Sequence, residues 1–399
     1  MKPTLHPILA HKGTRFSPYY KTCKSTKLEP LLKWPGGKEK ELKYIIPNLP
    51  EHFKNYYEPF VGGGAVYTAI KFEKSYINDK SRELIELYRI IQSAERQNLF
   101  AALNEIAHNW EILGNVAERH KQFFIELYKQ YSGNKIDESV LANGLFEFIL
   151  KHSKEFNGMF SDTYNFNTEN FIEELKKNLF RKIKRMKELE EKKHKLPDKD
   201  IIENIESALK SAFYMHFRHL YNSDNKYTSD RALKSAIFLF IRNFAYSSMF
   251  RYNLQGKFNV PYGGIAYNKK NFGKKIDFLS SDDLYEHLKT TVIDNEDFEV
   301  FLEKNNPTEE DFIFLDPPYD SEFSNYAQNG FTRDDQERLA NYMINKTKAK
   351  WMLIIKNTEF ILNLYDNKGL NIETFDKTYL VSFMNRNNKK AEHLLIRNY

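Results

Sequence analysis

The sequence predicts an α/β fold in which a mostly parallel, Rossmann-like sheet is interrupted by a large and mainly helical insertion. Two consecutive strand–loop–helix segments come first, at 55–70 and 74–92. From about 93 to 250 the chain reads as mostly helical, and strand–helix alternation returns after 273. Successive strand–helix units build parallel sheets, which bind ligands at the carboxyl ends of their strands. Two distant segments are therefore expected to form one sheet domain.

Composition indicates a globular chain. Hydrophobic residues make up 41% and aromatic residues 15% of the 399 residues. The single cysteine excludes an internal disulfide and a multi-cysteine metal site. No apolar run approaches the roughly 18 residues of a membrane span, and the first residues lack a secretory signal. We therefore expect a cytoplasmic protein without a membrane partner. The net charge of +6 favours a polyanionic partner only weakly.

Residues 31–92 begin the predicted sheet domain, after an irregular basic arm at 1–30. Residues 31–50 read as a loop and a short helix. Residues 55–70 read as a strand, a glycine-rich turn and the start of a helix. Residues 74–92 repeat this order, with a strand ending near Asp79 and apolar residues at helical spacing after it: Leu84, Leu87, Tyr88 and Ile91.

The turn at 58–64 favours a nucleoside ligand with a cationic tail over a nucleotide phosphate. Glycines after a strand let a ligand approach the backbone closely. No Gly-Lys-Ser/Thr ending follows Gly64, which argues against a P-loop, and Glu58 would repel a pyrophosphate. Asp79 stands about where an acid meets ribose hydroxyls. S-adenosylmethionine meets these conditions, and an ordinary strand–helix turn is the alternative.

Residues 93–272 are predicted to form a helical domain, leaving 31–92 and 273–399 for the sheet domain. The segment 171–189 has an apolar stripe and a basic opposite face, which we interpret as a solvated surface rather than a DNA-facing one. The stripe consists of Phe171, Leu175, Leu179, Ile183 and Met186. Residues 250–262 are typical of a hairpin with its turn at Gln255 and Gly256.

The last part of the sheet is expected from four further stretches. Strands are predicted within 290–298, 312–318 and 350–357, and a closing pair around 377–385 and 391–399. The strand at 312–318 ends in Asp316, Pro317, Pro318 and Tyr319. Proline cannot donate a ladder hydrogen bond, so the two prolines stop the strand and fix the chain direction.

This corner suits chemistry on the exocyclic amine of a nucleobase. The amine is a poor nucleophile because its lone pair is delocalised into the ring. The Asp316 carboxylate and the Pro317 carbonyl are placed to accept its two N–H bonds, and Tyr319 offers a face for stacking. A base must leave the duplex to reach such a pocket. Read alone, the corner is as well explained by a strand-terminating turn.

Taken together, these residues resemble the Dam-like family of DNA adenine N6-methyltransferases of the α motif order. Four segments carry the resemblance: "LLKWPGGK" at 31–38, "YEPFVGGGAV" with "YINDKSRELIELY" at 57–88, "FRYNLQGKFNVPYG" at 250–263, and "IFLDPPY" at 313–319. The resemblance implies a site-specific, S-adenosylmethionine-dependent DNA methyltransferase that acts on a flipped-out adenine and releases S-adenosylhomocysteine. It further implies double-stranded DNA as partner.

The resemblance implies roles for individual residues. Contacts to the methyl donor are expected from Trp34, Lys38, Glu58, Phe60, Gly62, Gly64, Asp79, Asp297, Phe298 and Asp316. The catalytic corner is Asp316, Pro317, Pro318 and Tyr319, and contacts to DNA are expected from Tyr246, Arg251, Asn253 and Lys257. Where well-known members have an Asn-Gly pair, this chain has Ser247 and Ser248, so a GATC target does not follow.

Three further expectations complete the interpretation. The chain acts as a monomer, as the modification half of a restriction–modification pair whose endonuclease acts separately. No metal is expected, since His216 and His219 have no acidic partners nearby in the sequence. A cytosine-N4 or RNA amino-methyltransferase is the alternative enzyme, and a DNA-binding regulator on an inactive fold is the alternative from another class.

Overall fold

The protein is described by a computed structural model covering residues 6–7, 28–157, 167–223, 230–319, 330–378 and 390–399. The chain divides into two compact units. The sheet unit comprises Met1–Gln92 and Ser281–Tyr399, and the helical unit comprises Ser93–Ser280. The sequence placed the second boundary at 272 instead of 280. The difference is one helix, α10 (Gly273–Ser280), which packs on helix α3 (Arg96–Arg119) of the helical unit.

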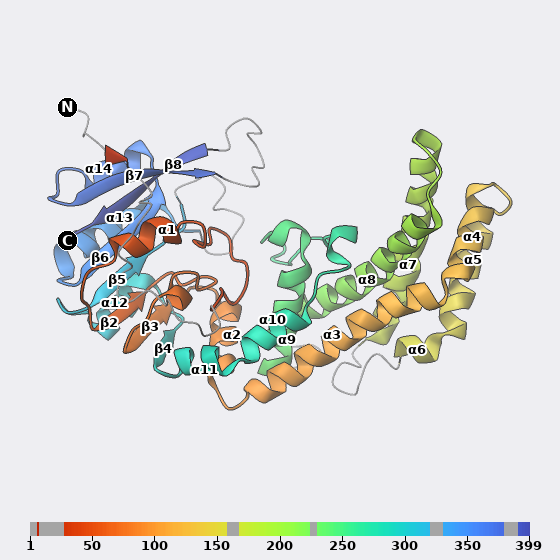
Figure 1. Ribbon diagram of the computed structural model, residues 1–399, viewed down its shortest axis with the longest axis horizontal. Coiled ribbons are helices and arrows are strands. Elements are labelled where there is room, and N and C mark those ends of the chain that lie inside the picture. Colours follow the sequence, from red (N-terminus) through yellow and green to blue (C-terminus); the bar gives the residue numbers. More distant parts are fainter. Residues whose placement is uncertain (1–5, 8–27, 158–166, 224–229, 320–329, 379–389) are drawn as a thin grey trace. The chain divides into compact units, whose positions relative to one another are not determined.

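The sheet unit contains one mixed sheet with the strand order β1-β7-β8-β6-β5-β2-β3-β4 (Figure 1). The strands are β1 (His6–Pro7), β2 (Asn55–Glu58), β3 (Lys74–Asn78), β4 (Thr291–Asp294), β5 (Phe312–Leu315), β6 (Lys350–Lys356), β7 (Asn371–Thr378) and β8 (Lys390–Arg397). Strand β8 pairs antiparallel with β6 and β7, and the other pairings are parallel. The mostly parallel, Rossmann-like sheet predicted from the sequence is confirmed.

Strand order reverses direction between β2 and β5. From β2 the sheet continues through β3 and β4 on one side, and through β5 and β6 on the other. Parallel strands end at the same edge of a sheet, so Glu58, Asn78 and Leu315 mark one edge. A crevice at such a reversal is where open α/β sheets bind ligands.

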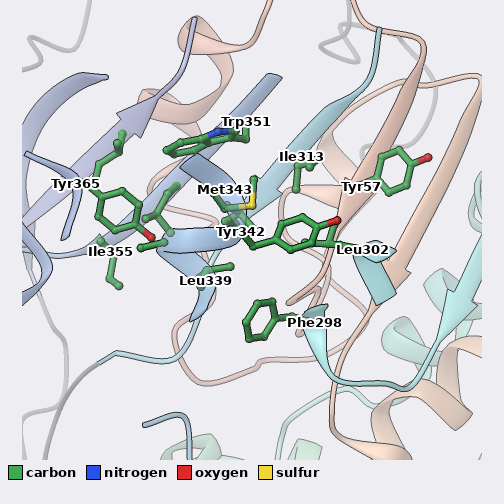
Figure 2. Packing of buried hydrophobic residues seen from close by; sticks show 14 of the residues in the cluster. Tyr57, Phe298, Leu302, Ile313, Leu339, Tyr342, Met343, Trp351, Ile355 and Tyr365 are labelled. Atoms are coloured by element: carbon green, nitrogen blue, oxygen red, sulfur yellow. The ribbon is translucent and has the colours of Figure 1, made fainter. Parts of the chain in front are cut away.

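Helices α12 (Phe298–Asn305), α13 (Arg333–Asn341) and α14 (Glu359–Tyr365) cover one face of the sheet, and Figure 2 shows their residues Phe298, Leu302, Leu339 and Tyr365 in the buried cluster. Their apolar residues pack with those of β2, β5, β6 and β8, and strand β5 is buried throughout because both its faces are covered. The helices of the sheet unit are α1 (Leu42–Ile45), α2 (Arg82–Gln92), α11 (Asp282–Lys289), α12 (Phe298–Asn305), α13 (Arg333–Asn341) and α14 (Glu359–Tyr365).

The helical unit packs around an aromatic core. Trp110 is buried, with the rings of Phe213, Phe240, Phe244 and Tyr262 within 4.3–6.2 Å of its own. Its helices are α3 (Arg96–Arg119), α4 (Lys121–Ser132), α5 (Glu138–Lys151), α6 (Ser153–Asn157), α7 (Thr168–Lys192), α8 (Asp198–Tyr221), α9 (Arg231–Phe244) and α10. The apolar stripe predicted on 171–189 is buried in α7, as expected.

Three elements differ from the sequence prediction. The helix expected after the glycine turn is only a 3₁₀ turn, Tyr67–Ala69, because Ile70 already has extended backbone angles and is buried ahead of β3. The hairpin at 250–262 has isolated bridges, Ala245 to Tyr262 and Tyr252 to Phe258, instead of strands. The strand predicted at 377–385 begins earlier, as β7, and residues 379–389 lie outside the described part, as does most of the arm at 1–30.

Candidate active site

Asp316 lies at the carboxyl end of β5 and forms an ion pair with Lys38. The Lys38 side chain is only 2% exposed, and its ammonium also donates to the Gly36 carbonyl at 2.8 Å and to the Tyr319 hydroxyl at 3.2 Å. The same ammonium lies 5.3 Å from the centre of the Tyr319 ring. One buried cation therefore joins the segment at 31–38 to the corner at 316–319.

A second side chain holds the proline corner by a hydrogen bond from helix α13 (Arg333–Asn341). Gln336, buried in α13, donates from Nε2 to the Pro318 carbonyl at 2.8 Å. Pro317 is buried, and Pro318 is exposed. Gln336 could not be predicted from the sequence, because a glutamine in a charged helix has no local pattern that marks a contact with a residue 18 positions away. The corner is thus fixed by its prolines and by one amide.

The glycine turn lies directly against the segment at 31–34. Gly62 and Gly64 have φ angles of +50° and +78°, which side-chain-bearing residues rarely adopt. A Cβ at Gly62 would lie 2.8 Å from the Trp34 ring, and one at Gly63 would collide with the Leu32 carbonyl. The sequence predicts that the glycines let a ligand come close. At Gly62 and Gly63 they instead let the segment that contains Leu32 and Trp34 come close.

Asp79 follows β3 and is held by backbone amides. Its Oδ1 accepts from the Ser81 amide at 2.8 Å, and its Oδ2 accepts from the Gly62 amide at 3.1 Å. Burial raises the pKa of Asp79 to about 6, the two amide hydrogen bonds oppose that shift, and the charge of Asp316 adds to it. The Asp316 charge therefore acts on Asp79, and the pKa of Asp79 lies nearer to neutral pH than that of an ordinary aspartate.

Glu58 ends β2 as a buried carboxyl group. Its Oε2 accepts from the Tyr56 hydroxyl at 2.6 Å. Burial raises the pKa of Glu58 well above its usual value, and the Asp316 charge acts in the same direction, while Tyr56 and Lys38 act against it. The sequence alone predicts a negatively charged Glu58. Its burial instead favours the protonated form until a cation comes close.

Asp297 and Phe298 follow strand β4 in the chain, as the N-cap and the first residue of helix α12. Asp297 caps the helix by accepting from the Glu299 amide, and it pairs with Lys80 and Arg338 at 3.2 and 3.1 Å. Burial opposes a fall in the pKa of Asp297, yet the hydrogen bonds from Arg338 and the other donors lower it. Phe298 is buried and its ring centre lies 5.7 Å from that of Phe60.

The positions expected to contact DNA belong to the helical unit. Tyr246 is 50% exposed, and Arg251, Asn253 and Lys257 are exposed. The Asn253 side chain closes the turn, since its Oδ1 accepts from the amides of Gln255 and Lys257 at 3.0 and 2.9 Å. Asn253 therefore has a structural contact that the sequence interpretation did not foresee.

Ser247 and Ser248 have φ angles of +51° and +52°, in the left-handed region that asparagine and glycine adopt most easily. The backbone shape typical of an Asn-Gly pair is therefore present without those residues.

His216, considered above as a metal ligand, is buried and hydrogen-bonds to Asn170 at 3.2 Å. Burial lowers the pKa of His216 to about 3.

Comparisons with known proteins identify a family. Residues 34–208 and 198–380 match the family described as D12 class N6 adenine-specific DNA methyltransferase. The chain is 24% identical over 377 residues to the type II methyltransferase M.CviBI of Paramecium bursaria Chlorella virus NC1A, covering 93% of this chain and 100% of that protein. It is 26% identical over 390 residues to the type II methyltransferase M.MjaIII of Methanocaldococcus jannaschii, covering 93% and 99%.

A third relative is the DNA adenine methylase of Vibrio cholerae, which is 22% identical over 373 residues, covering 91% of this chain and 94% of the relative.

Within the described residues, no helix has both the length and the hydropathy that crossing a bilayer requires.

Proposed function

Because the chain belongs to the D12 class of N6 adenine-specific DNA methyltransferases, we propose that Asp316, Pro317, Pro318 and Tyr319 form the site where it methylates the exocyclic amine of an adenine in duplex DNA. The expected family and activity are confirmed by that membership. The observation that supports this placement is the corner itself, an acid at the carboxyl end of β5 where the strand order reverses.

The methyl donor is proposed to be S-adenosylmethionine, whose sulfonium supplies the methyl group. The chemistry of the available groups fits such a ligand. The Asp79 carboxylate has two oxygens, each already fixed by one backbone amide, so it is pre-oriented to accept from ribose hydroxyls. Glu58, whose burial favours the protonated form, becomes a better partner once a cationic group is near. The remaining donor contacts are proposed for Trp34, Lys38, Phe60, Gly62, Gly64, Asp297, Phe298 and Asp316, with S-adenosylhomocysteine as product.

The chain's own contribution to the reaction is positioning. Asp316 accepts one N–H of the target amine, and the Pro317 carbonyl accepts the other, which draws the amine nitrogen toward a tetrahedral geometry. Forming the new N–C bond releases one proton from that nitrogen, and Asp316 is the carboxylate placed to receive it. Lys38 and Gln336 hold the corner in one orientation, and Tyr319 offers its ring to the base.

Duplex DNA is the substrate class of this family. We place its contacts on Tyr246, Arg251, Asn253 and Lys257 of the helical unit, with Tyr246 filling the gap left by the extruded base. Because two of the relatives are named as type II methyltransferases, we further propose that the chain is the modification half of a restriction–modification pair. A separate endonuclease and a monomeric enzyme belong to that proposal.

One experiment tests the reaction and the corner together. The protein is incubated with S-adenosylmethionine labelled at the methyl group and with duplex DNA, and the DNA is digested to nucleosides. We expect labelled N6-methyl-2′-deoxyadenosine from the wild type. The same product is expected from the control variant Asp277→Ala, which changes an exposed aspartate outside the sheet unit. Asp316→Ala should bind DNA with unchanged affinity and transfer no methyl group. Label on cytosine would overturn the proposed base, and normal turnover by Asp316→Ala would overturn the proposed site.

A further inference from the structure

The helical unit contains a group of side chains that the methyl-transfer site does not use. His120, His152 and Glu155 each offer one possible ligand atom, and the three atoms lie within 4.8 Å of one another. No local motif marks this group, since His120 and His152 are 32 residues apart in the sequence. We propose that these three side chains form a binding site for a divalent transition-metal ion, with Zn²⁺ as the ion that suits them best.

Two of the three ligand spacings fit a tetrahedral ion, and the third, between the two imidazole nitrogens, lies within 4.8 Å. His120 Nε2 lies 3.4 Å and His152 Nδ1 lies 3.2 Å from the same atom, Glu155 Oε1. Zinc bonds to nitrogen and oxygen are about 2.0–2.2 Å long, so two ligands at a tetrahedral angle stand about 3.3 Å apart. Both pairs therefore already have the spacing of tetrahedron edges. Two imidazoles and one carboxylate are a known zinc ligand set, and Mg²⁺ or Ca²⁺ would require more oxygen ligands.

One carboxylate and the ends of several helices surround the three side chains. His120 is the C-cap of α3, which has 24 residues, and His152 is the C-cap of α5, which has 14. The carboxyl ends of α3 and α5 carry a partial negative charge, but His120 is also the N-cap of α4 and α6 begins at Ser153, so the positive ends of two further helices lie beside the same residues. The negative charge that attracts a cation is therefore that of the Glu155 carboxylate. Arg119 lies on the far oxygen of the carboxylate, with its Nη1 3.0 Å from Oε2. That arrangement leaves Oε1 for the ion, and ligating carboxylates are commonly hydrogen-bonded in this way.

The site is accessible from solvent and partly shielded. The three side chains are 17%, 19% and 28% exposed, which lets an ion enter and a water complete the coordination. The buried ring of Phe148 lies 5.2 Å from the His120 ring and 4.6 Å from the His152 ring, and forms an apolar wall. An ion here would tie the junction of α3 and α4 to the ends of α5 and α6. Its role is therefore to brace the helical unit.

A metal titration of the full chain tests the site. After dialysis against a chelator, calorimetric titration with Zn²⁺ should give one ion per chain for the wild type. His152→Ala and Glu155→Ala should weaken that binding more than about 100-fold, since even loss of an outer-shell partner costs about 10–100-fold. His108→Ala, an exposed histidine of α3, should bind as the wild type does. Less than one ion in the wild type, or equal affinity in all four proteins, would overturn the site.

Two readouts keep the result independent of folding and of methyl transfer. Circular dichroism reports whether each variant retains its helix content. Co²⁺ added to the wild type should give the intense visible bands of a four-coordinate ion, and these bands should be absent from His120→Ala. A weak six-coordinate spectrum in the wild type would show the trio to be an ordinary hydrogen-bonded cluster and would overturn the proposal.

Discussion

At the scale of single residues, the most consequential contact is that between Lys38 and Asp316. The two residues are 278 positions apart, yet the ammonium of one lies on the carboxylate of the other inside a site where Lys38 is almost fully buried. Removing one member of a buried pair leaves a charge without compensation, which is costly. Lys38 is therefore expected to support methyl transfer in two ways, by orienting Asp316 and by contacting the methyl donor.

Lys38→Met should lower the rate of methyl transfer by about 100-fold or more, because Asp316 then loses the cation that orients it. DNA affinity should not change, since DNA contacts are assigned to the helical unit. Single-turnover transfer and DNA binding by fluorescence anisotropy measure the two effects. Lys40→Met, an exposed lysine two positions away, serves as the matched control and should transfer at the wild-type rate. Equal rates for the two variants would remove the role given to the ion pair.

Asp79 predicts a pH dependence for binding of the donor. Ribose hydroxyls bond best to the ionised carboxylate, and the pKa of Asp79 is raised to about 6 by burial. Affinity for S-adenosylhomocysteine should therefore rise as pH increases from about 5 to 7, with its midpoint near 6. Calorimetry across this range measures it. Asp79→Asn should bind weakly and with no such midpoint, and a midpoint that persists in this variant would assign the titration to another group.

The same carboxyl group affects folding with the opposite sign. Its pKa in the folded chain lies above that of an unfolded aspartate, so between pH 4 and 6 the folded state holds a proton that the unfolded state has lost. The contribution of Asp79 to stability is therefore complete below about pH 4 and is lost as pH rises through 6. Donor binding near neutral pH works against this loss.

Ser248 provides a test of backbone strain. At φ of +52° a residue with a Cβ costs roughly 1 kcal/mol relative to glycine. Ser248→Gly should therefore leave the free energy of unfolding unchanged or raise it by up to about 1 kcal/mol, after the entropy cost of glycine is subtracted. Ser280→Gly, at the end of α10, should instead lower it by roughly 0.5 kcal/mol. Urea denaturation compares them, and a loss of stability in Ser248→Gly would contradict the strain argument.

Individual residues of the site could be chosen from the sequence, but their partners could not. Asp316 and Asp79 stand at strand ends, where hydrophobic runs stop, and that pattern is local. The contacts of Lys38 with Asp316 and of Gln336 with Pro318 join separate segments, and only the folded sheet brings these together. The same limit hid the His120, His152 and Glu155 cluster, whose members come from three helix ends.

At the scale of elements, helix α8 and the residues that follow it hold the loop at 258–260. Tyr214 and Arg218 both donate to the Val260 carbonyl at 3.0 Å. One helical turn further on, Asn222 donates to the Phe258 carbonyl at 2.9 Å and accepts from the Phe258 amide at 2.8 Å. Residues spaced by four lie on one helix face, so Tyr214, Arg218 and Asn222 form a single stripe that hydrogen-bonds to the backbone of the loop. These hydrogen bonds hold the loop in place, as pairing between strands would do in a regular hairpin.

Asn222→Ala should lower the free energy of unfolding by about 1–3 kcal/mol, because it leaves the buried Phe258 amide and carbonyl without these hydrogen bonds. DNA affinity should fall as well, since Arg251 and Lys257 precede the freed segment. Asn204→Ala, within helix α8, removes only a bond to the Asp200 carbonyl and should be close to neutral. Thermal denaturation and anisotropy compare the two variants, and equal effects would show that the stripe does not hold the loop.

Elements were predictable where a pattern is local and were missed where packing overrides it. Strand β5 was found because an apolar run stops at two prolines, and α7 because its apolar stripe has helical spacing. The helix expected after the glycine turn is only a 3₁₀ turn, since Ile70 extends into the buried approach to β3. Strand β7 begins at Asn371 rather than at 377, because its pairing with β8 includes residues 371–376. Apolar and polar residues alternate only weakly in that stretch, so the sequence pattern did not mark it.

At the scale of the whole molecule, the proposed tasks of the chain are divided between two units. The proposed donor and corner residues belong to the sheet unit, and the proposed DNA contacts belong to the helical unit, which is inserted between α2 and α11. The sequence already indicated this organisation, because strand–helix alternation stops near 93 and resumes after 273. An inserted unit of this kind lets base recognition vary while the chemistry of the sheet edge stays the same.

This separation predicts that salt affects the two ligands differently. Phosphate contacts release counterions from DNA, so affinity for duplex DNA should fall steeply with salt, by roughly 1000-fold between 50 and 200 mM if about six phosphates are neutralised. S-adenosylhomocysteine carries no phosphate, so its affinity should change less than about twofold over the same range. Anisotropy and calorimetry on one protein preparation measure both dependences. Because neutralised phosphates set the slope, Lys257→Ala should make the DNA dependence shallower by about one phosphate contact without altering the other ligand. A DNA affinity that is flat with salt would mean that the positive charges of the helical unit face solvent instead of the duplex.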